Sequence, residues 1–350
     1  MMHSSNSSDT VASMTFAYRY STAPMMDWTD QHWRVFARTL TRRALLYTEM
    51  VTAPALVHGN LEYLTAHDPS EYPLALQLGG SKPEELALAV KRVRDLGFCE
   101  INLNLGCPSD RVQAGAFGAA LMANPDQVAR CLIAMQDASG AQGPEITAKI
   151  RLGINDQNEE DSLPEFIQVL DRIGIQRIII HARKAILGGL SPKQNREIPP
   201  LNYPLVYQIK KNFPHLTIIL NGGLKSSASC LAQMNQVDGV MVGRYAYQMP
   251  SCLLEVDPLF FQSPPPHASV EDALEAYRPY VEQGLQKGLP LKHFTRHLVG
   301  LYHEVPGARL FRRVLSESAH RPGADWSVVD SALGHIRESM DYVEHSGLAS

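Results

Sequence analysis

Short apolar runs recur along the first two thirds of the chain, and a segment of helical or loop character follows each of them. This alternation is typical of β–α units and a parallel sheet. Eight such runs predict an α/β fold of the (β/α)₈ TIM-barrel type. No Gly-x-Gly-x-x-Gly follows the first run, which weighs against an open, doubly wound sheet. The predicted strands are Tyr18–Ala23, Leu45–Met50, Pro73–Leu78, Glu100–Leu105, Glu145–Arg151, Arg177–His181, Thr217–Asn221 and Gly239–Val242.

Alternation along these strands separates side chains into two faces, because successive residues of a strand point to opposite sides. In a barrel, one face packs against the helices and the other points inward. Polar side chains that share the inward face near several strand ends would converge on one mouth, where barrel active sites lie. The predicted inward set is Ala75, Gln77, Thr147, Lys149, Arg151, Ile219 and Asn221.

The stretch 100–109 carries the strongest single signal for chemistry. Asn102 and Asn104 share the face opposite Ile101, Leu103 and Leu105. The strand then enters a Gly-Cys-Pro turn, which places a thiol at the carboxyl end of a buried strand. Cys107 is therefore a candidate catalytic residue, and the alternative is a buried structural cysteine. Cys99 we assign to that structural class.

After residue 242 the strand pattern ends. A Pro-rich stretch is followed by segments of helical spacing only, over 270–287, 291–302, 306–319 and 326–345. We therefore predict four parts: a disordered tail (1–13), a catalytic TIM barrel (14–260), a Pro-rich linker (261–269) and a C-terminal all-helical domain (270–350).

Composition agrees with a globular protein: 45% of the 350 residues are hydrophobic and 19% are charged. No apolar run approaches the roughly 18 residues that span a bilayer. The N-terminus lacks the pattern of a signal peptide. Five cysteines without a Cys-x-x-Cys pair suit a reducing cytoplasm, where we expect the protein to act.

Two glycine-containing loops predict an anion site at the barrel mouth. Asn221-Gly-Gly223 and Gly243-Arg244 follow the last two predicted strands, where barrels often bind phosphate. Lys149, on the inward face, could form a Schiff base, pair with a buried acid or hold an electron-rich cofactor ring. Together with Gln77 and His181, this arrangement suits flavin mononucleotide (FMN).

Two basic clusters contrast with the net charge of −4. One is the loop after the sixth strand, with Arg183, Lys184, Lys193 and Arg196. The other is the segment 287–321, which has seven Lys or Arg against two Glu. Arg309, Arg312 and Arg313 share one helix face there. The alternatives are a solvated face, with Arg313 paired to Glu317, and a footprint for a polyanion.

A metal site is not expected. His293 and His297 are four residues apart on a predicted helix, but Lys292 and Arg296 flank them and would repel a cation. The chain contains no His-Glu-x-x-His.

These motifs resemble the tRNA-dihydrouridine synthases, most closely their A subfamily. The resemblance runs from about residue 18 to about residue 317, and the stretch Gly189-Leu-Ser-Pro-Lys193 is similar to the signature of that subfamily. The other matching motifs are Ala23-Pro-Met-Met-Asp27, Gln77-Leu-Gly-Gly80, Asn102-Leu-Asn-Leu-Gly-Cys-Pro-Ser-Asp-Arg111, Lys149, His181-Ala-Arg-Lys184, the continuation Gln194-Asn-Arg-Glu-Ile-Pro199, Asn221-Gly-Gly223, Gly243-Arg244, Pro306-Gly-Ala-Arg309 and Arg312-Arg313.

The resemblance implies an FMN barrel that reduces uridines 20 and 20a in the D-loop of tRNA to 5,6-dihydrouridine, with NADPH as the reductant. Hydride would go to C6 of uracil and Cys107 would give a proton to C5. A free thiol has a pKa of about 8.5 and so carries its proton near pH 7. The implied FMN-binding residues are Pro24, Met25, Met26, Gln77, Lys149, His181, Asn221, Gly222, Gly223, Gly243 and Arg244. The implied tRNA-binding residues are Asn104, Lys193, Arg196, Arg309 and Arg312.

Three other functions remain as alternatives at this point. A flavin dehydrogenase of a free pyrimidine such as dihydroorotate would share the barrel, the FMN and the loop cysteine. It would have no use for a basic helical domain. A Schiff-base aldolase would use Lys149 and be colourless. A non-catalytic RNA-binding protein would bind tRNA without flavin turnover.

Overall fold

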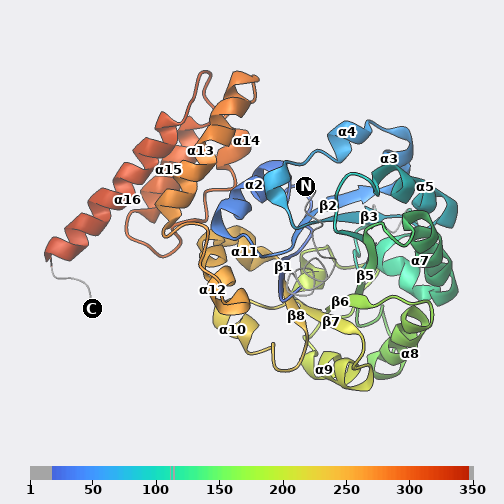
Figure 1. Cartoon of the computed structure of the whole chain (residues 1–350). Coiled ribbons are helices and arrows are strands. Elements are labelled where there is room, and N and C mark those ends of the chain that lie inside the picture. The colour runs from blue at the N-terminus through green and yellow to red at the C-terminus, as the bar shows by residue number, and fades with distance from the viewer. Residues whose placement is uncertain (1–17, 111, 113–114, 347–350) are drawn as a thin grey trace, which may run out of the picture. The chain divides into compact units, whose positions relative to one another are not determined.

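The computed structural model describes residues 18–110, 112 and 115–346, and the predicted tail lies outside them. Eight parallel strands form one sheet in the order β1-β8-β7-β6-β5-β4-β3-β2 (Figure 1). Hydrogen bonds between Leu45 and the strand residues Tyr20 and Thr22 close the sheet into a barrel. The strands are β1 (Tyr20–Thr22), β2 (Leu46–Thr52), β3 (Leu74–Gly79), β4 (Glu100–Leu105), β5 (Glu145–Arg151), β6 (Arg177–His181), β7 (Thr217–Asn221) and β8 (Gly239–Val242).

The predicted TIM barrel is thereby confirmed, and strands β4 to β8 have the predicted bounds. The first three strands differ from the prediction by one or two residues at each end. In β1 the difference has a local cause, because residues 18 and 19 form a turn before the ladder with β8 begins at Tyr20.

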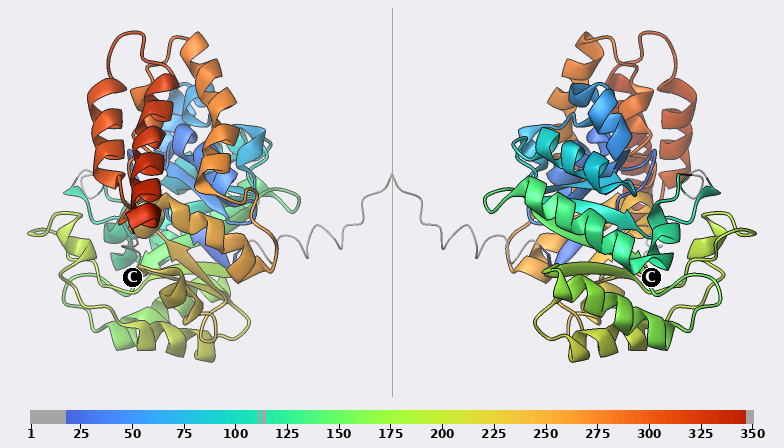
Figure 2. Two further views of the ribbon diagram at one scale, coloured as in Figure 1. Left: turned by 90° about the vertical axis from the view of Figure 1, so that its left-hand side faces the viewer. Right: turned by 90° about the vertical axis from the view of Figure 1, so that its right-hand side faces the viewer.

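Helices surround the barrel (Figures 1 and 2). Local signals delimit them. In α7, Asn124 caps the first turn by accepting from the Gln127 amide and Pro125 takes the first helical position, while Gly140, with φ of +72°, follows the last turn. The helices of this unit are α3 (Ala53–His58), α4 (Leu61–Leu64), α5 (Pro83–Val93), α7 (Pro125–Ser139), α8 (Glu159–Arg172), α9 (Tyr203–Asn212) and α10 (Ser227–Leu231), with 3₁₀ turns η1 (Pro69–Glu71), η2 (Gly118–Ala123) and η3 (Gln194–Arg196).

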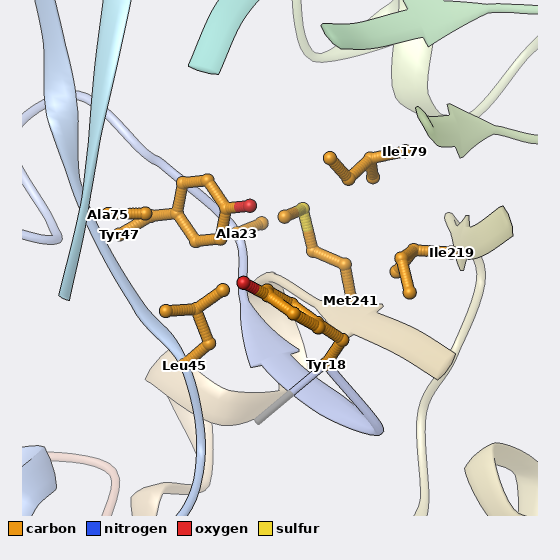
Figure 3. Packing of buried hydrophobic residues seen from close by; sticks show 8 residues of the cluster. All are labelled: Tyr18, Ala23, Leu45, Tyr47, Ala75, Ile179, Ile219 and Met241. Atoms are coloured by element: carbon orange, nitrogen blue, oxygen red, sulfur yellow. The ribbon is translucent and has the colours of Figure 1, made fainter. Parts of the chain in front are cut away.

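A cluster of buried, mostly apolar side chains fills the interior of the barrel (Figure 3). Ile179 and Ile219 lie side by side on the paired strands β6 and β7, and Met241 comes from the next strand, β8. The members shown are Tyr18, Ala23, Leu45, Tyr47, Ala75, Ile179, Ile219 and Met241. Because these side chains fill the interior, we expect a ligand to approach the polar inward residues at the carboxyl end of the strands.

Contacts divide the described residues into two compact units: those up to residue 27 with those from 43 to 243, and those from 28 to 42 with those from 244 onward. The second unit is helical and includes α2, which packs against α13. The proposed domain bounds at 260 and 270 stay a prediction; residues 262–269 contain no helix or strand. This unit comprises α2 (Gln31–Leu40), α11 (Arg244–Gln248), η4 (Pro250–Glu255), α12 (Val256–Phe261), α13 (Val270–Gln286), α14 (Lys292–Thr295), α15 (Ala308–Ser318) and α16 (Ser327–Ser346).

One predicted helix of this unit is wrong in length. The helical spacing over 291–302 yields only α14, followed by successive turns. Gly300 packs so closely on Gln248 that a Cβ would lie 2.1 Å from its carbonyl oxygen, and the backbone here forms i to i−3 bonds instead. Tertiary packing has overridden the local pattern.

None of the helices among the described residues combines the length and the apolar character needed to cross a bilayer.

Candidate active site at the carboxyl end of the barrel

The Cys107 turn is built by the side chain of Asn104. Its Oδ1 accepts from the backbone N–H groups of Gly106 (3.1 Å) and Cys107 (2.9 Å), so the chain leaves β4 in a fixed turn. The Cys107 thiol is partly buried and lies 3.5 Å from the Ser109 hydroxyl. The thiol predicted to be catalytic therefore lies in a loop at the barrel mouth. Cys99, by contrast, lies at the other end of β4, where burial raises its pKa to about 12.

Lys149 and Asn221 meet across the mouth. Lys149 Nζ donates to Asn221 Oδ1 over 3.0 Å, and Asn221 Nδ2 donates to the Met241 carbonyl over 2.7 Å. Burial lowers the pKa of Lys149 to about 7, and the nearby charge of Arg151 adds to this effect. Lys149 therefore gives up its proton more readily than a free lysine, and the protein partner of its amine is a neutral amide.

Arg151 joins three segments at the mouth. Its Nε donates to the Gly106 carbonyl (3.1 Å), and its Nη1 donates to the carbonyls of Asn195 (3.0 Å) and Lys184 (3.3 Å). The side chain is 3% exposed. Sequence reasoning places Arg151 on the inward face without a role. The structure makes it the clamp between the cysteine turn and the loop after β6.

His181 ends β6 beside the glycine pair that follows β7. Gly222 and Gly223 have φ of +103° and +74°, and a Cβ on Gly222 would lie 2.6 Å from His181 Cδ2. Burial, followed by the charges of Arg151 and Lys149, lowers the pKa of His181 well below its usual range. The ring is therefore neutral, and only glycine allows the backbone to pass so close to it. Tyr203, which sequence reasoning misses, holds this loop by donating to the Gly222 carbonyl over 2.6 Å.

The remaining predicted FMN residues follow β1 and β8. Pro24 and Met25 are partly buried, and Met26 is 56% exposed. Gly243 lies next to this segment, since a Cβ there would be 3.4 Å from Met25 Sδ. Arg244 begins α11 and belongs to the second unit, so the structure does not place it at the mouth.

Comparison with known proteins agrees with this arrangement. The dihydrouridine synthase (Dus) family profile matches residues 21–335. The chain belongs to the dihydrouridine synthase family. A tRNA-dihydrouridine(20/20a) synthase of Vibrio parahaemolyticus is 49% identical over 329 residues, which cover 94% of this chain and 100% of that protein. The protein of the same name from Escherichia coli K12 is 52% identical over 316 residues, 90% of each chain. Among solved structures, morphinone reductase covers 73% of this chain and 88% of its own with a TM-score of 0.48 and 10% identity, too little likeness to carry an argument.

Sequence reasoning about this Dus-family chain misses a polar network below the mouth. Gln77 Nε2 donates to Asn102 Oδ1, and Asn102 Nδ2 donates to the Thr147 hydroxyl, each over 2.8 Å. The network ends on Glu100, which is buried and paired with Arg177 at 3.2 Å. Strand alternation places Asn102 and Thr147 inward, and a charged residue inside a strand is the available signal for Glu100.

The residues expected to bind tRNA occupy three places in this Dus-family structure. Asn104 lies in the Cys107 turn, where it also donates to Gln77 Oε1 over 2.8 Å. Lys193 and Arg196 are exposed at η3, in the loop that Arg151 anchors.

Arg309 and Arg312 lie on the exposed face of α15, opposite the buried Ala308, Phe311 and Leu315. Within the described part of the chain, Arg313 and Glu317 form no ion pair, and neither Arg309 nor Arg312 has a carboxylate partner. The pairing considered as an alternative is therefore absent.

Proposed function

We propose that this protein is a tRNA-dihydrouridine(20/20a) synthase that binds FMN, takes electrons from NADPH and reduces uridines 20 and 20a of tRNA. The observation that carries the proposal is the uncompensated positive charge beside Cys107. Lys149 bonds to an amide and Arg151 to three backbone carbonyls; among the described residues neither has a carboxylate partner. A buried cation without a counter-ion favours an anionic ligand.

Flavin mononucleotide fits this mouth. Gly222 and Gly223 follow β7 and have no side chains of their own to keep a phosphate from their peptide N–H groups. Lys149 would lie near the ring and favour its reduced, negatively charged form. Gln77, His181 and Asn221 supply further polar groups. We expect Pro24, Met25, Met26, Gly243 and Arg244 to complete the site.

When bound, FMN would supply hydride to C6 of the uracil ring. The role left to the protein is to deliver a proton to C5, and Cys107 is the group that we assign to this step. Asn104 holds the Cys107 backbone in place, and Arg151 holds the preceding carbonyl. A proton donor held in this way is typically worth about 10² to 10⁴ in rate.

The substrate is an RNA, so positive charge away from the mouth should hold its phosphates. Lys193 and Arg196 in the first unit and Arg309 and Arg312 in the second are exposed and suit this role. A base inside an RNA fold must leave its stack to enter a barrel mouth. Five free cysteines suit a reducing compartment, so we propose a cytoplasmic location.

Purification and two assays test the proposal. The protein should purify yellow, with FMN released on denaturation. With NADPH it should convert uridine to dihydrouridine in unmodified tRNA, measured by nucleoside mass spectrometry. Cys107→Ala should keep FMN and oxidise NADPH, yet form dihydrouridine about 10² to 10⁴ times more slowly. Cys99→Ala is the matched control, since that thiol lies at the other end of β4.

A colourless protein that cannot be reconstituted with FMN would overturn the flavin assignment. Turnover of free pyrimidines but not of tRNA would overturn the substrate assignment. Product formation by Cys107→Ala at the wild-type rate would remove Cys107 from the chemistry.

A further inference from the structure

A single chain of hydrogen bonds runs inside the barrel from the Cys107 turn to Glu100. The Cys107 amide donates to Asn104, whose Nδ2 donates to Gln77 Oε1 over 2.8 Å. Gln77 Nε2 in turn donates to Asn102 over 2.8 Å. We name this path the amide chain, and its members in order are Cys107 N–H, Asn104, Gln77, Asn102, Thr147 and Glu100.

Every donor in the amide chain points the same way, away from the mouth. Asn102 Nδ2 donates to the Thr147 hydroxyl over 2.8 Å, and that hydroxyl donates to Glu100 Oε1 over 2.5 Å. Gln77, Asn102 and Thr147 are each at most 1% exposed, so water cannot replace a missing partner.

Both ends of the amide chain determine its direction. At the upper end, two backbone N–H groups can only donate, so Asn104 must turn Oδ1 toward them and Nδ2 toward Gln77. At the lower end, Glu100 faces Arg177, which can only donate. Tyr47 also donates to Glu100 Oε1, and burial, followed by the charge of Glu100, raises the pKa of this phenol well above its usual value. Burial raises the pKa of Glu100, but Arg177 and the bonds from Thr147 and Tyr47 oppose this rise. Because all three partners donate to its two oxygens, Glu100 accepts at the lower end.

We infer that Glu100 and Thr147 are positioning residues that set the orientation of the Asn104 amide from the base of the barrel. Asn104 Oδ1 is occupied by two N–H groups, so the hydrogen-bonding capacity that remains on this partly exposed side chain is an N–H. A ligand group that meets Asn104 must then be an acceptor. A ring carbonyl of uracil or of flavin meets this requirement, and an exocyclic amino group, as in cytosine, does not.

This inference deepens the proposed function and rests on it only for the identity of the ligand. The orientation of Asn104 can be followed without flavin or tRNA, because the same amide holds the backbone of Cys107. If the amide chain breaks at Thr147, Asn102 loses its acceptor and Asn104 can reorient. The Cys107 turn should then loosen and its thiol should react faster.

The test compares variants that differ in one hydroxyl. Thr147→Val removes the hydroxyl at nearly constant volume, and Thr147→Ala and Thr147→Ser form a second pair that differs in the hydroxyl alone. Tyr47→Phe is the matched control: it also removes a buried hydroxyl that donates to Glu100 Oε1 but lies outside the amide chain. Iodoacetamide labelling of Cys107 is followed by peptide mass spectrometry. Single-turnover formation of dihydrouridine in tRNA by the pre-reduced enzyme is the second measurement.

We expect Thr147→Val and Thr147→Ala to label Cys107 at least about threefold faster than wild type, the equivalent of one hydrogen bond, and to form dihydrouridine more slowly. Thr147→Ser and Tyr47→Phe should stay at the wild-type labelling rate. Equal labelling of Thr147→Val and wild type, or of the Ala and Ser variants, would overturn the inference. So would a Tyr47→Phe effect as large as that of Thr147→Val. If Thr147→Val does not fold, the Ala and Ser pair decides. If the wild-type protein forms no dihydrouridine, the proposed function fails while the labelling comparison still stands.

Discussion

The lowered pKa of Lys149 predicts that removing this side chain stabilises the protein without its cofactor. Burial lowers the pKa of Lys149 from its usual 10.5 to about 7, so the folded state binds this proton less tightly than the unfolded state. The free-energy cost is fully present below pH 7 and fades as the pH rises toward 10.5. Lys149→Met, a neutral side chain of similar length, abolishes this cost.

The size of the effect follows from the two pKa values. At about 1.36 kcal/mol per unit, the cost of the charge is about 4.5 kcal/mol at pH 6 and about 2 kcal/mol at pH 9. The variant also leaves Asn221 Oδ1 without its donor, a penalty of about 1–3 kcal/mol that does not depend on pH. The difference between the two pH values is free of that penalty. We therefore expect the gain in unfolding free energy to be about 2.5 kcal/mol larger at pH 6 than at pH 9.

The assay is equilibrium urea unfolding of the FMN-free protein at both pH values, for wild type and Lys149→Met. The exposed Lys225→Met carries the same change of charge without burial and serves as the control. A Lys149→Met effect that is equal at pH 6 and pH 9 would refute the reasoning, because it would mean that Lys149 stays fully protonated in the folded state. The same variant should bind FMN more weakly, as expected for a functional charge that costs stability.

Other parts of the two units support four further predictions. Replacing both Arg309 and Arg312 with Ala should weaken tRNA binding while the FMN content stays unchanged. The slope of log K against log salt should fall by roughly 0.7–0.9 for each phosphate that is no longer neutralised. An unchanged slope, measured by filter binding, would exclude α15 from tRNA recognition. Arg151→Lys keeps the charge but cannot reach three carbonyls. Dihydrouridine formation, measured by nucleoside mass spectrometry, should therefore fall by about tenfold or more while flavin is retained. Turnover at the wild-type rate would contradict the role of Arg151 in holding the cysteine turn to the loop after β6. Gly222→Ala should lower the free energy of unfolding, measured in urea, by about 1–3 kcal/mol, because φ is +103° and the methyl group meets His181. Gly334→Ala is the control and should cause no backbone strain, since a Cβ there meets nothing within 4 Å. Asp30→Asn should lower the stability of the second unit by about 1–3 kcal/mol at pH 7. Burial alone would raise the pKa of Asp30, but the bonds to His297 and Trp33 hold this pKa below its usual range. The difference in stability between wild type and variant should therefore shrink as the pH falls below about 4.

Local pattern determined most of the barrel. Strands β4 to β8 have the predicted bounds because each is a short, largely apolar run, as expected for parallel strands that are buried on both faces. Alternation along the strands places Gln77, Lys149 and Asn221 inward, and the Gly-Cys-Pro turn places Cys107 at the mouth. Steric demands at Gly222 and Gly223 are likewise local, since glycine alone takes their positive φ without strain.

Tertiary structure decided which of these residues act together. The bonds of Arg151 reach residues 33 to 45 positions away, and Lys149 meets Asn221 across 72 positions. Such partners depend on strand register and loop paths, which periodicity does not encode. The helix expected over 291–302 shows the same limit, because the close approach of Gly300 to Gln248 interrupts a pattern that is helical by spacing. The amide chain is the clearest case: sequence alternation puts Asn102 and Thr147 on the inward face, but only the alignment of β3, β4 and β5 connects them into one path to Glu100.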